Sequence, residues 1–284
     1  MSVDKESMRK RVAALKNVPT LPSIFEKINR LMEGSDTAAE DIANIISSDQ
    51  ALSARLLRVV NSVFYGFPGR ISNLTHALII LGFDVVKGLV LSTSVFEMML
   101  AEGFNSLWEH SLGCAVTAGV ITKKIDCPNP EEISIAALLH DIGKVIIKIE
   151  LPEESSLIDQ EVAKRQISTF EAEEKVLGFN HTTIGRWLCQ EWHLPKELSD
   201  PIIYHHKPNF SRFARRATAI VHIADVLVRG IGFGFAGDNM VPQIDPKSWE
   251  TLDISDSQLE DIIKAIEEKL EDAEDFLSLN GIEV

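Results

Sequence analysis

The stretch "AALLHDIGKVII", residues 136–147, places a histidine and an aspartate side by side between two apolar runs. Residues 136–139 and 145–147 have the character of a buried helix, whereas His140 and Asp141 carry nitrogen and oxygen donors that can bind metal ions. A carboxylate that is buried without a partner costs several kcal/mol or takes up a proton. The stretch therefore predicts a core helix whose end presents Asp141 to a cation, to hydrogen-bond donors or to solvent.

Apolar residues at helical spacing continue through most of the chain on both sides of this stretch, and strand-like alternation is scarce. In the first third, the predicted helices cover residues 21–34, 39–62 with a break at residues 47–48, and 72–82. The last of these helices has Ser72 or Asn73 as its cap and Gly82 as its stop. Short helices joined by tight turns are typical of a helical bundle or solenoid, so the sequence predicts an all-α fold.

Composition and charge narrow the class of protein. The chain has 284 residues, enough for one large domain or two modest ones, with 45% hydrophobic and 25% charged residues. Its formal net charge of −14 disfavours a broad nucleic-acid surface, which needs clustered lysine and arginine. No apolar run reaches the ~20 residues of a membrane span, and the first residues lack the apolar core of a secretory signal. We expect a cytoplasmic protein without a membrane partner.

The three cysteines, Cys114, Cys127 and Cys189, are widely spaced and form no CxxC pair. An odd number of scattered cysteines is typical of reduced, structural thiols inside a cell. This spacing excludes a zinc ribbon.

The distribution of histidine suggests a boundary near residues 100–106. Seven of the eight histidines follow this point, and no Pro-, Gly- or Ser-rich linker marks it. We therefore expect a helical part at residues 1–104 and a second helical part at residues 105–284, packed together as one unit. The second part ends in an acidic amphipathic helix, whose apolar positions should dock on the body. These positions are Leu259, Ile262, Ile263, Ile266 and Leu270.

The glycine-rich segment "RGIGFGFAGDNM", residues 229–240, predicts a loop. It contains no GxxxxGK[ST] pattern and no strand-to-helix context, so we do not expect it to cradle phosphate.

Beyond the doublet at residues 140–141, further ligand-type side chains stand beside apolar helical segments. They are His110, His181, His205, His206 and Asp225. Taken singly, each has an ordinary structural interpretation, and a helix cap or Arg229 could satisfy Asp225. Taken together, they offer the nitrogen and oxygen donors that suit Fe, Mn, Zn or Ni, and a shared aspartate could bridge two ions ~4 Å apart. The histidines interpreted as structural are His76, His193 and His222.

The order of these motifs resembles that of a known superfamily. "LWEHS" (107–111), "ALLHDIGKVII" (137–147), "HTTIGRWLCQEWHLP" (181–195), "IIYHHKP" (202–208) and "VHIADVLV" (221–228) look like successive motifs of the HD metal-dependent phosphohydrolases. Residues 49–92, from "DQALSARLLRVVNS" to "FDVVKGLVLS", resemble the N-terminal signature of the HDOD family, helical signalling proteins related to those enzymes. The resemblance spans residues 18–230 and implies a multi-helix HD-type bundle with an N-terminal helical HDOD subdomain.

The resemblance also implies a role for each ligand-type residue. The ligands of one metal ion would be His110, His140, Asp141 and Asp225. A second ion, as in the HD-GYP cyclic-di-GMP phosphodiesterases, would be held by the bridging Asp141 together with His181, His205 and His206. In an active enzyme the catalytic residues would be Asp141 and Lys144, because the matching lysine contacts the substrate phosphate.

The sequence departs from the phosphodiesterase pattern at three places. No GYP triplet is present, and "HHKP" (205–208) lacks the acidic residue that usually follows the histidine pair. Ser106 also stands where some of these enzymes have a glutamate ligand. The resemblance therefore implies a signal-transduction or regulatory module that binds one or two divalent transition-metal ions and acts through signalling protein partners. The alternative is an active metal-dependent phosphohydrolase for a nucleotide, a cyclic dinucleotide or another small phosphate-containing molecule.

The two aspartates of this pattern lead to an expectation about stability. Without an ion, Asp141 and Asp225 would repel each other, since like charges disfavour ionisation of both groups. The sequence therefore predicts that Asp141→Ala costs the metal-free protein little stability.

Overall fold

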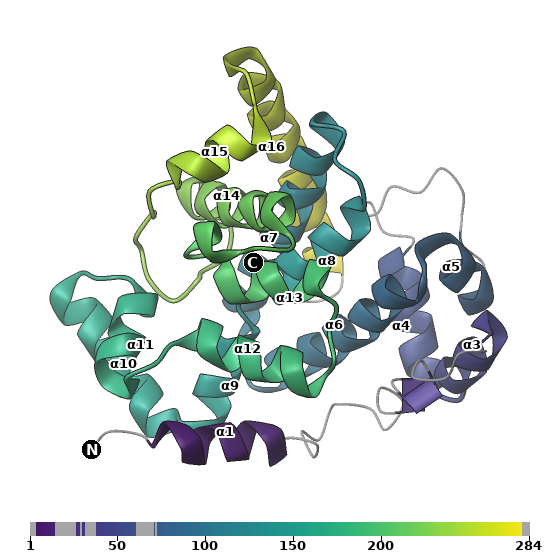
Figure 1. Cartoon of the computed structure of the whole chain (residues 1–284), viewed down its shortest axis with the longest axis horizontal. Coiled ribbons are helices and arrows are strands. Elements are labelled where there is room, and N and C mark those ends of the chain that lie inside the picture. Colours follow the sequence, from purple (N-terminus) through teal and green to yellow (C-terminus); the bar gives the residue numbers. More distant parts are fainter. Residues whose placement is uncertain are drawn as a thin grey trace.

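The computed structural model describes residues 4–14, 27–28, 30–31, 38–60, 71 and 73–279, and it is built from helices (Figure 1). No strand occurs within these ranges, which confirms the predicted all-α class. The helices of the first part are α1 (Lys5–Ala14), α3 (Ala39–Ser47), α4 (Gln50–Val60), α5 (Leu74–Leu81) and α6 (Phe83–Ala101). They are followed by α7 (Asn105–Lys124), α8 (Pro130–Leu139), α9 (Ile142–Glu150), α10 (Pro152–Arg165), α11 (Thr169–Leu177), α12 (His181–Glu191), α13 (Lys196–Tyr204), the 3-10 turn η2 (Pro208–Phe210), α14 (Arg215–Ile231), α15 (Pro246–Leu252) and α16 (Asp256–Leu279).

The helix breaks that the sequence predicts in the first part are present. α3 and α4 are separated at residues 48–49, and α5 begins after Asn73, whose side chain accepts a hydrogen bond of 2.8 Å from the His76 backbone N–H. Gly82 ends α5, and its φ of 83° lies in the left-handed region that favours glycine. The helix predicted at residues 21–34 lies largely outside the described residues.

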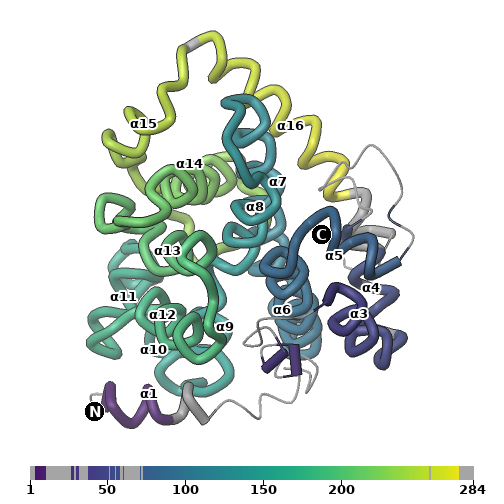
Figure 2. The backbone as a smooth tube through the Cα atoms, turned by 45° about the vertical axis from the view of Figure 1, so that its right-hand side comes forward, coloured from purple at the N-terminus to yellow at the C-terminus, as the bar shows by residue number. Residues whose placement is uncertain are grey.

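α6 is a long helix that connects the α3–α5 group with the helices around α8. It packs against α4 and α5 on one side and against α7 and α8 on the other, so α3–α5 form a group at one end and α10 and α11 lie at the other (Figures 1 and 2). Most of its side chains are buried, which is typical of a helix that is apolar around its whole circumference. The division into two parts at residue 104 stays a prediction.

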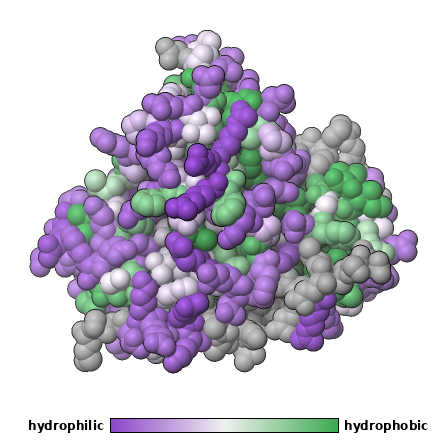
Figure 3. All heavy atoms as spheres, in the orientation of Figure 1, coloured by the Kyte–Doolittle hydropathy of each residue, from purple (hydrophilic) through white to green (hydrophobic). Residues whose placement is uncertain are grey.

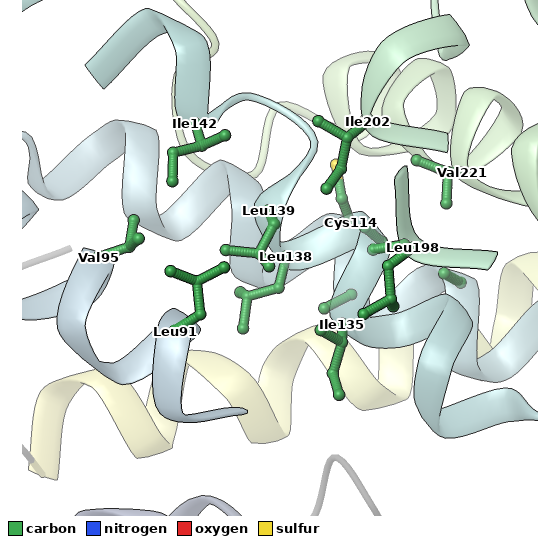
Figure 4. Packing of buried hydrophobic residues seen from close by; sticks show 14 of the residues in the cluster. Leu91, Val95, Cys114, Ile135, Leu138, Leu139, Ile142, Leu198, Ile202 and Val221 are labelled. Atoms are coloured by element: carbon green, nitrogen blue, oxygen red, sulfur yellow. The ribbon is translucent and has the colours of Figure 1, made fainter. Parts of the chain in front are cut away.

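The hydrophobic core is continuous from the α3–α5 group to the helices around α8. At its centre, Leu91 of α6 lies beside Leu138 of α8, and Leu198 of α13 lies beside Ile135 (Figure 4). These four side chains are between 0% and 8% exposed. Burial of such a side chain contributes about 1.5–3 kcal/mol, so this core fixes the position of the end of α8, where His140 follows.

The acidic C-terminal helix docks on α7, as the sequence predicts, but with one residue fewer than expected. Ile262, Ile266 and Leu270 are buried and Leu259 is partly buried, whereas Ile263 is 37% exposed. The expectation for Ile263 is therefore wrong, because the helix turns this position away from the line of contact.

The surface in the view of Figure 1 is mostly hydrophilic, and apolar side chains gather toward the α3–α5 group (Figure 3). On α5, Ile79 and Ile80 are 70% and 48% exposed. Within the described ranges, none of the helices combines the length and the apolar character that crossing a bilayer requires.

Candidate metal centre

The histidine–aspartate doublet lies at the junction of two helices. His140 follows the last residue of α8 as its C-cap, and Asp141 precedes the first residue of α9. Their side chains are 1% and 2% exposed. The predicted position of the doublet at a helix end is therefore correct, and a second helix begins directly after it.

The first group of ligand-type side chains forms around His110 of α7. Its Nε2 atom lies 3.2 Å from Oδ1 of Asp225 on α14 and 3.8 Å from Oδ2 of Asp141. His140 Nε2 lies 3.3 Å from the same Asp141 oxygen and 4.0 Å from Asp225 Oδ1. The ligand atoms of two helices and of the α8–α9 junction thus converge on one small volume.

The second group forms on the other side of Asp141. Its Oδ1 atom lies 3.4 Å from Nε2 of His181, the first residue of α12, and 3.7 Å from Nε2 of His205 at the end of α13. His181 Nε2 is also 3.4 Å from His205 Nε2 and 3.1 Å from His206 Nε2. The ligand atoms of this group all lie within 4.8 Å of one another, close enough to surround one ion.

Asp141 stands between the two groups and turns a different carboxylate oxygen toward each. Oδ2 faces His110 and His140, and Oδ1 faces His181 and His205. This is the arrangement in which one carboxylate can bridge two ions.

Hydrogen bonds from the far side of each ring orient three of the histidines. His140 Nδ1 donates to the Ala137 carbonyl at 2.6 Å, and His205 Nδ1 donates to the Ile202 carbonyl at 3.1 Å. His181 Nδ1 lies 2.6 Å from the buried carboxylate of Glu173, which also accepts from the His181 backbone N–H at 2.9 Å. Such outer partners are typical of metal-binding histidines, because they leave Nε2 unprotonated and directed at the ion.

Several of the converging atoms have no hydrogen-bond partner among the described residues. They are His140 Nε2, Asp141 Oδ1 and Asp225 Oδ1. A buried polar atom without a partner costs about 1–3 kcal/mol, and such atoms are rare in folded proteins. One ion at each group would satisfy these atoms, so the donor set fits a metal.

The charges of both aspartates also suit an ion. Burial raises the pKa of Asp141, but the neighbouring His140 and Lys144 outweigh it and hold this pKa well below its usual range. Burial acts in the same way at Asp225, where His110 keeps the carboxyl pKa well below its usual range. Both side chains are therefore carboxylates at neutral pH, the form that binds metal.

The pKa shifts of the histidines in the site have opposite directions. Burial lowers the pKa of His110, and it lowers the pKa of His205 and His206 strongly, with neighbouring histidines adding to the effect at these two. These rings are neutral at pH 7 and ready to bind an ion. At His140, burial lowers the pKa but the adjacent Asp141 carboxylate raises it more, so that the net shift is upward.

Lys144 lies within the site rather than free in an open pocket. Its Nζ atom donates to Asp141 Oδ2 at 2.6 Å and to the Ala236 carbonyl at 2.9 Å, and the residue is 4% exposed. Both acceptors belong to the protein. The lysine would have to leave at least one of them to contact a phosphate group.

The glycine-rich segment covers the site. After α14, residues 232–245 form the α14–α15 loop, in which the Phe235 N–H donates to the Ser106 carbonyl at 2.8 Å. Gly234 has a φ of +66°, and a Cβ atom there would lie 2.2 Å from the backbone nitrogen of His110. Only glycine allows the loop to approach α7 this closely, which explains why a segment without a phosphate-binding pattern is rich in glycine.

Arg229 anchors the same loop, and its positive charge also helps to hold the pKa of Asp225 below its usual range. Its guanidinium pairs with the buried carboxylate of Asp238, which also accepts from the Thr169 N–H at 2.7 Å and from the Met240 N–H at 2.8 Å. The pKa of Asp238 is lowered because Arg229 outweighs the effect of burial. The loop is thus fixed to the start of α11.

Two cavities border the site without opening into its centre. One of about 490 Å³ is lined by Lys144, Ser106 and Glu173 together with the α14–α15 loop. The other, of about 340 Å³, is lined by His206 and His222. Neither cavity is lined by His110, His140, Asp141 or Asp225.

The remaining histidines lie apart from the ligand atoms of both groups. His222 donates from Nδ1 to the His205 carbonyl at 2.7 Å and accepts at Nε2 from the Asp245 N–H at 2.9 Å, so it fixes the backbone behind a site residue. His193 and His76 are exposed. The sequence did not predict that Glu173 would contact His181, and it did not predict the partners of His222.

The all-α architecture and the buried His/Asp cluster together define an HD-type, phosphohydrolase-like fold. The sequence model of the HDOD domain matches residues 18–208, and the chain belongs to the HDOD domain family.

Solved structures agree with this assignment. An HDOD domain protein of unknown function from Geobacter sulfurreducens is 26% identical, with 93% of this chain and 99% of that chain covered and a TM-score of 0.64. A provisionally named metal-dependent phosphohydrolase from Shewanella amazonensis SB2B shares the fold at 19% identity, with 89% and 92% covered and a TM-score of 0.55. A provisionally named signal transduction protein from Marinobacter aquaeolei VT8 shares it at 17% identity, with 92% and 59% covered and a TM-score of 0.68.

Among curated proteins, a protein of Treponema pallidum named only as uncharacterized is 26% identical over 217 residues. The match covers 75% of this chain and 42% of that protein, so the chain spans less than half of its length.

Proposed function

We propose that this protein is an HDOD-type signal-transduction module that holds one or two divalent transition-metal ions and acts through contacts with signalling proteins. The ligands are the two groups that share Asp141, with Fe, Mn, Zn and Ni as the candidate ions. The name of the similar Marinobacter protein supports the signalling role. The name of the similar Shewanella protein supports the metal.

The observation that carries the metal proposal is the set of unpartnered buried atoms. His140 Nε2, Asp141 Oδ1 and Asp225 Oδ1 come from separate places in the chain and meet without hydrogen bonds among the described residues. If these histidines and aspartates only formed hydrogen bonds with one another, their Nε2 and carboxylate oxygen atoms would all have hydrogen-bond partners. An ion at each group explains why they converge.

The cover of the site supports a regulatory role over an open active site. The Lys144 side chain is hydrogen-bonded to Asp141. The α14–α15 loop lies over α7 at Gly234 and over Lys144 at Ala236. A substrate would need to displace these contacts before it could reach the ligands, whereas an ion held for structure or signalling would not.

Purified protein, prepared without chelators, is expected to contain close to one or two equivalents of a transition metal. Inductively coupled plasma mass spectrometry measures this content directly. A content below about a tenth of an equivalent, even after incubation with Fe, Mn, Zn or Ni under reducing conditions, would contradict the metal proposal, because such sites bind tightly when their ligands are preformed.

A second candidate, a metal-dependent phosphohydrolase, is favoured by the cavity of about 490 Å³ that adjoins Lys144. A divalent ion in this cluster would supply a water that is nucleophilic at neutral pH. Lys144, once released from the Ala236 carbonyl, could steady the charge of a phosphate group placed in the cavity.

We expect any hydrolytic activity to depend on Lys144, because the other residues that border this cavity near the cluster, Ser106 and Glu173, carry no positive charge. A screen of phosphomonoesters, nucleotides and cyclic dinucleotides with Mn or Fe tests this, with Lys144→Met as the variant. Lys148→Met, which removes a neighbouring lysine of the same cavity that does not touch Asp141, is the matched control. Turnover that persists in Lys144→Met would show that the activity does not use this site.

A further inference from the structure

We propose that Cys114 is a ligand of the first metal position, so that this position binds its ion through sulfur as well as nitrogen and oxygen. The proposal rests on the proposed function, because it adds a ligand to the group formed by His110, His140 and Asp225.

The position of Cys114 on α7 places it beside a ligand that the site already contains. It follows His110 by four residues, a spacing that puts both side chains on the same face of a helix. Cys114 Sγ lies 3.6 Å from His110 Nε2, and the residue is 0% exposed. Two ligand atoms of one tetrahedral ion, with bonds of about 2.0–2.3 Å, are separated by roughly 3.5 Å. The sulfur therefore already has the spacing of a neighbouring ligand.

The other ligand atoms of this group lie close to the Cys114 sulfur and to one another. The Cys114 sulfur and one ligand atom each from His110, His140 and Asp225 all lie within 4.8 Å of one another. His140 Nε2 and Asp225 Oδ1 are two of the buried atoms that lack hydrogen-bond partners among the described residues. Two nitrogens, one carboxylate and one thiol, together with Oδ2 of the shared Asp141 beside the two nitrogens, supply enough donors for a four- or five-coordinate ion.

The alternative role for Cys114 is that of a small apolar side chain in the core, where Figure 4 shows it near Ile202 and Leu198. Buried free cysteines often have this role. Cys127 and Cys189 are also buried, yet within the described part of the chain neither belongs to a group of potential ligands. The proximity of Cys114 to unpartnered donor atoms thus distinguishes it from the other two.

A sulfur ligand would make the two metal positions chemically different. The first would combine a thiolate with imidazole and carboxylate, a set that favours zinc or iron over manganese or magnesium. The second, with Asp141 and the imidazoles of His181, His205 and His206, contains no sulfur. On binding, Cys114 would lose its thiol proton to solvent, since a coordinating thiol is deprotonated.

Substitution with cobalt tests this proposal on the full chain. We expect the wild-type protein, loaded with about two equivalents of Co²⁺, to show a sulfur-to-cobalt charge-transfer band in the near ultraviolet. Cys114→Ser should lose this band and bind Zn²⁺ at least about tenfold more weakly. Cys189→Ser, which removes a buried thiol outside both groups, should keep the band and the affinity.

The outcomes separate this inference from the proposed function. Visible ligand-field absorption without the charge-transfer band, or a band unchanged in Cys114→Ser, would overturn the sulfur ligand and leave the metal site standing. Failure of every variant to bind Co²⁺ or Zn²⁺ would overturn both. If Cys114→Ser does not fold, X-ray absorption of the zinc-loaded wild-type protein decides, because a sulfur ligand gives a scatterer at about 2.3 Å.

Discussion

Replacement of Asp141 by asparagine is expected to lower the metal content of the purified protein by at least about tenfold, because this side chain takes part in both ligand groups. Its Oδ2 faces His110 and His140, and its Oδ1 faces His181 and His205. An amide keeps the shape of the side chain but loses the charge that binds a divalent ion. Both positions should weaken together, which mass spectrometry of the purified variant would show.

Asparagine is preferable to alanine in this experiment because of Lys144. The structure changes the expectation that Asp141→Ala costs little stability, since Asp141 accepts a hydrogen bond of 2.6 Å from the buried ammonium of Lys144. Removing one partner of a buried ion pair costs about 3–5 kcal/mol. The asparagine oxygen can still accept from Lys144, so a loss of metal can be separated from a loss of fold.

The matched control for this experiment is Asp159→Asn on α10. Its carboxylate is 60% exposed and lies 3.9 Å from Lys148, outside both ligand groups. This variant should retain the wild-type metal content. A wild-type content in Asp141→Asn, with circular dichroism that shows a folded protein, would mean that Asp141 does not bridge the two positions.

Replacement of Gly143 by alanine is expected to destabilise the protein by about 3 kcal/mol or more, an effect at the upper end of overpacking. A Cβ atom at this position would lie 2.0 Å from the backbone carbonyl oxygen of His181 and 2.9 Å from its Cα. These are backbone atoms at the start of α12, and they cannot move without carrying the His181 ring away from Asp141. Urea unfolding should show the loss of stability, and metal analysis should show a parallel loss of bound ion.

Gly119→Ala on α7 is the control for the effect of adding a methyl group to a helical glycine. A Cβ atom there meets only the side-chain oxygen of Ser134 at 3.2 Å, which can rotate away. Because alanine favours helix over glycine by about 1 kcal/mol, this variant should be neutral or more stable. Equal stability of the Gly143→Ala and Gly119→Ala proteins would contradict the close approach of α9 and α12.

The parts of the structure that the sequence predicts are those with a local signal. Helical spacing and cap residues locate α3, α4 and α5, and the apolar runs on both sides of the doublet locate α8 and α9. The family resemblance brings together residues that lie far apart in the chain, such as His110 and Asp225, and the structure places them 3.2 Å apart. Their role as ligands stays a prediction.

The parts that the sequence misses depend on contacts between distant segments. Glu173 lies among several carboxylates of α11, and nothing in its neighbourhood distinguishes it from Glu171 or Glu174 as the partner of His181. Gly143 lies inside α9 and is small because α12 passes over it. A one-dimensional pattern shows that a residue is small, but it does not show what lies against it.

Two of the contacts that hold the α14–α15 loop over the site depend on backbone groups of the loop. Lys144 donates to the backbone carbonyl of Ala236, and the backbone N–H of Phe235 donates to the backbone carbonyl of Ser106. Neither contact uses a side chain of the loop, so substitutions at residues 235 and 236 leave the donor and acceptor groups in place. Lys144 supplies the single side chain in the pair. At these two contacts the side chain that a point mutation can remove is therefore Lys144 on α9, whereas the third tie of the loop depends on the side chains of Arg229 and Asp238.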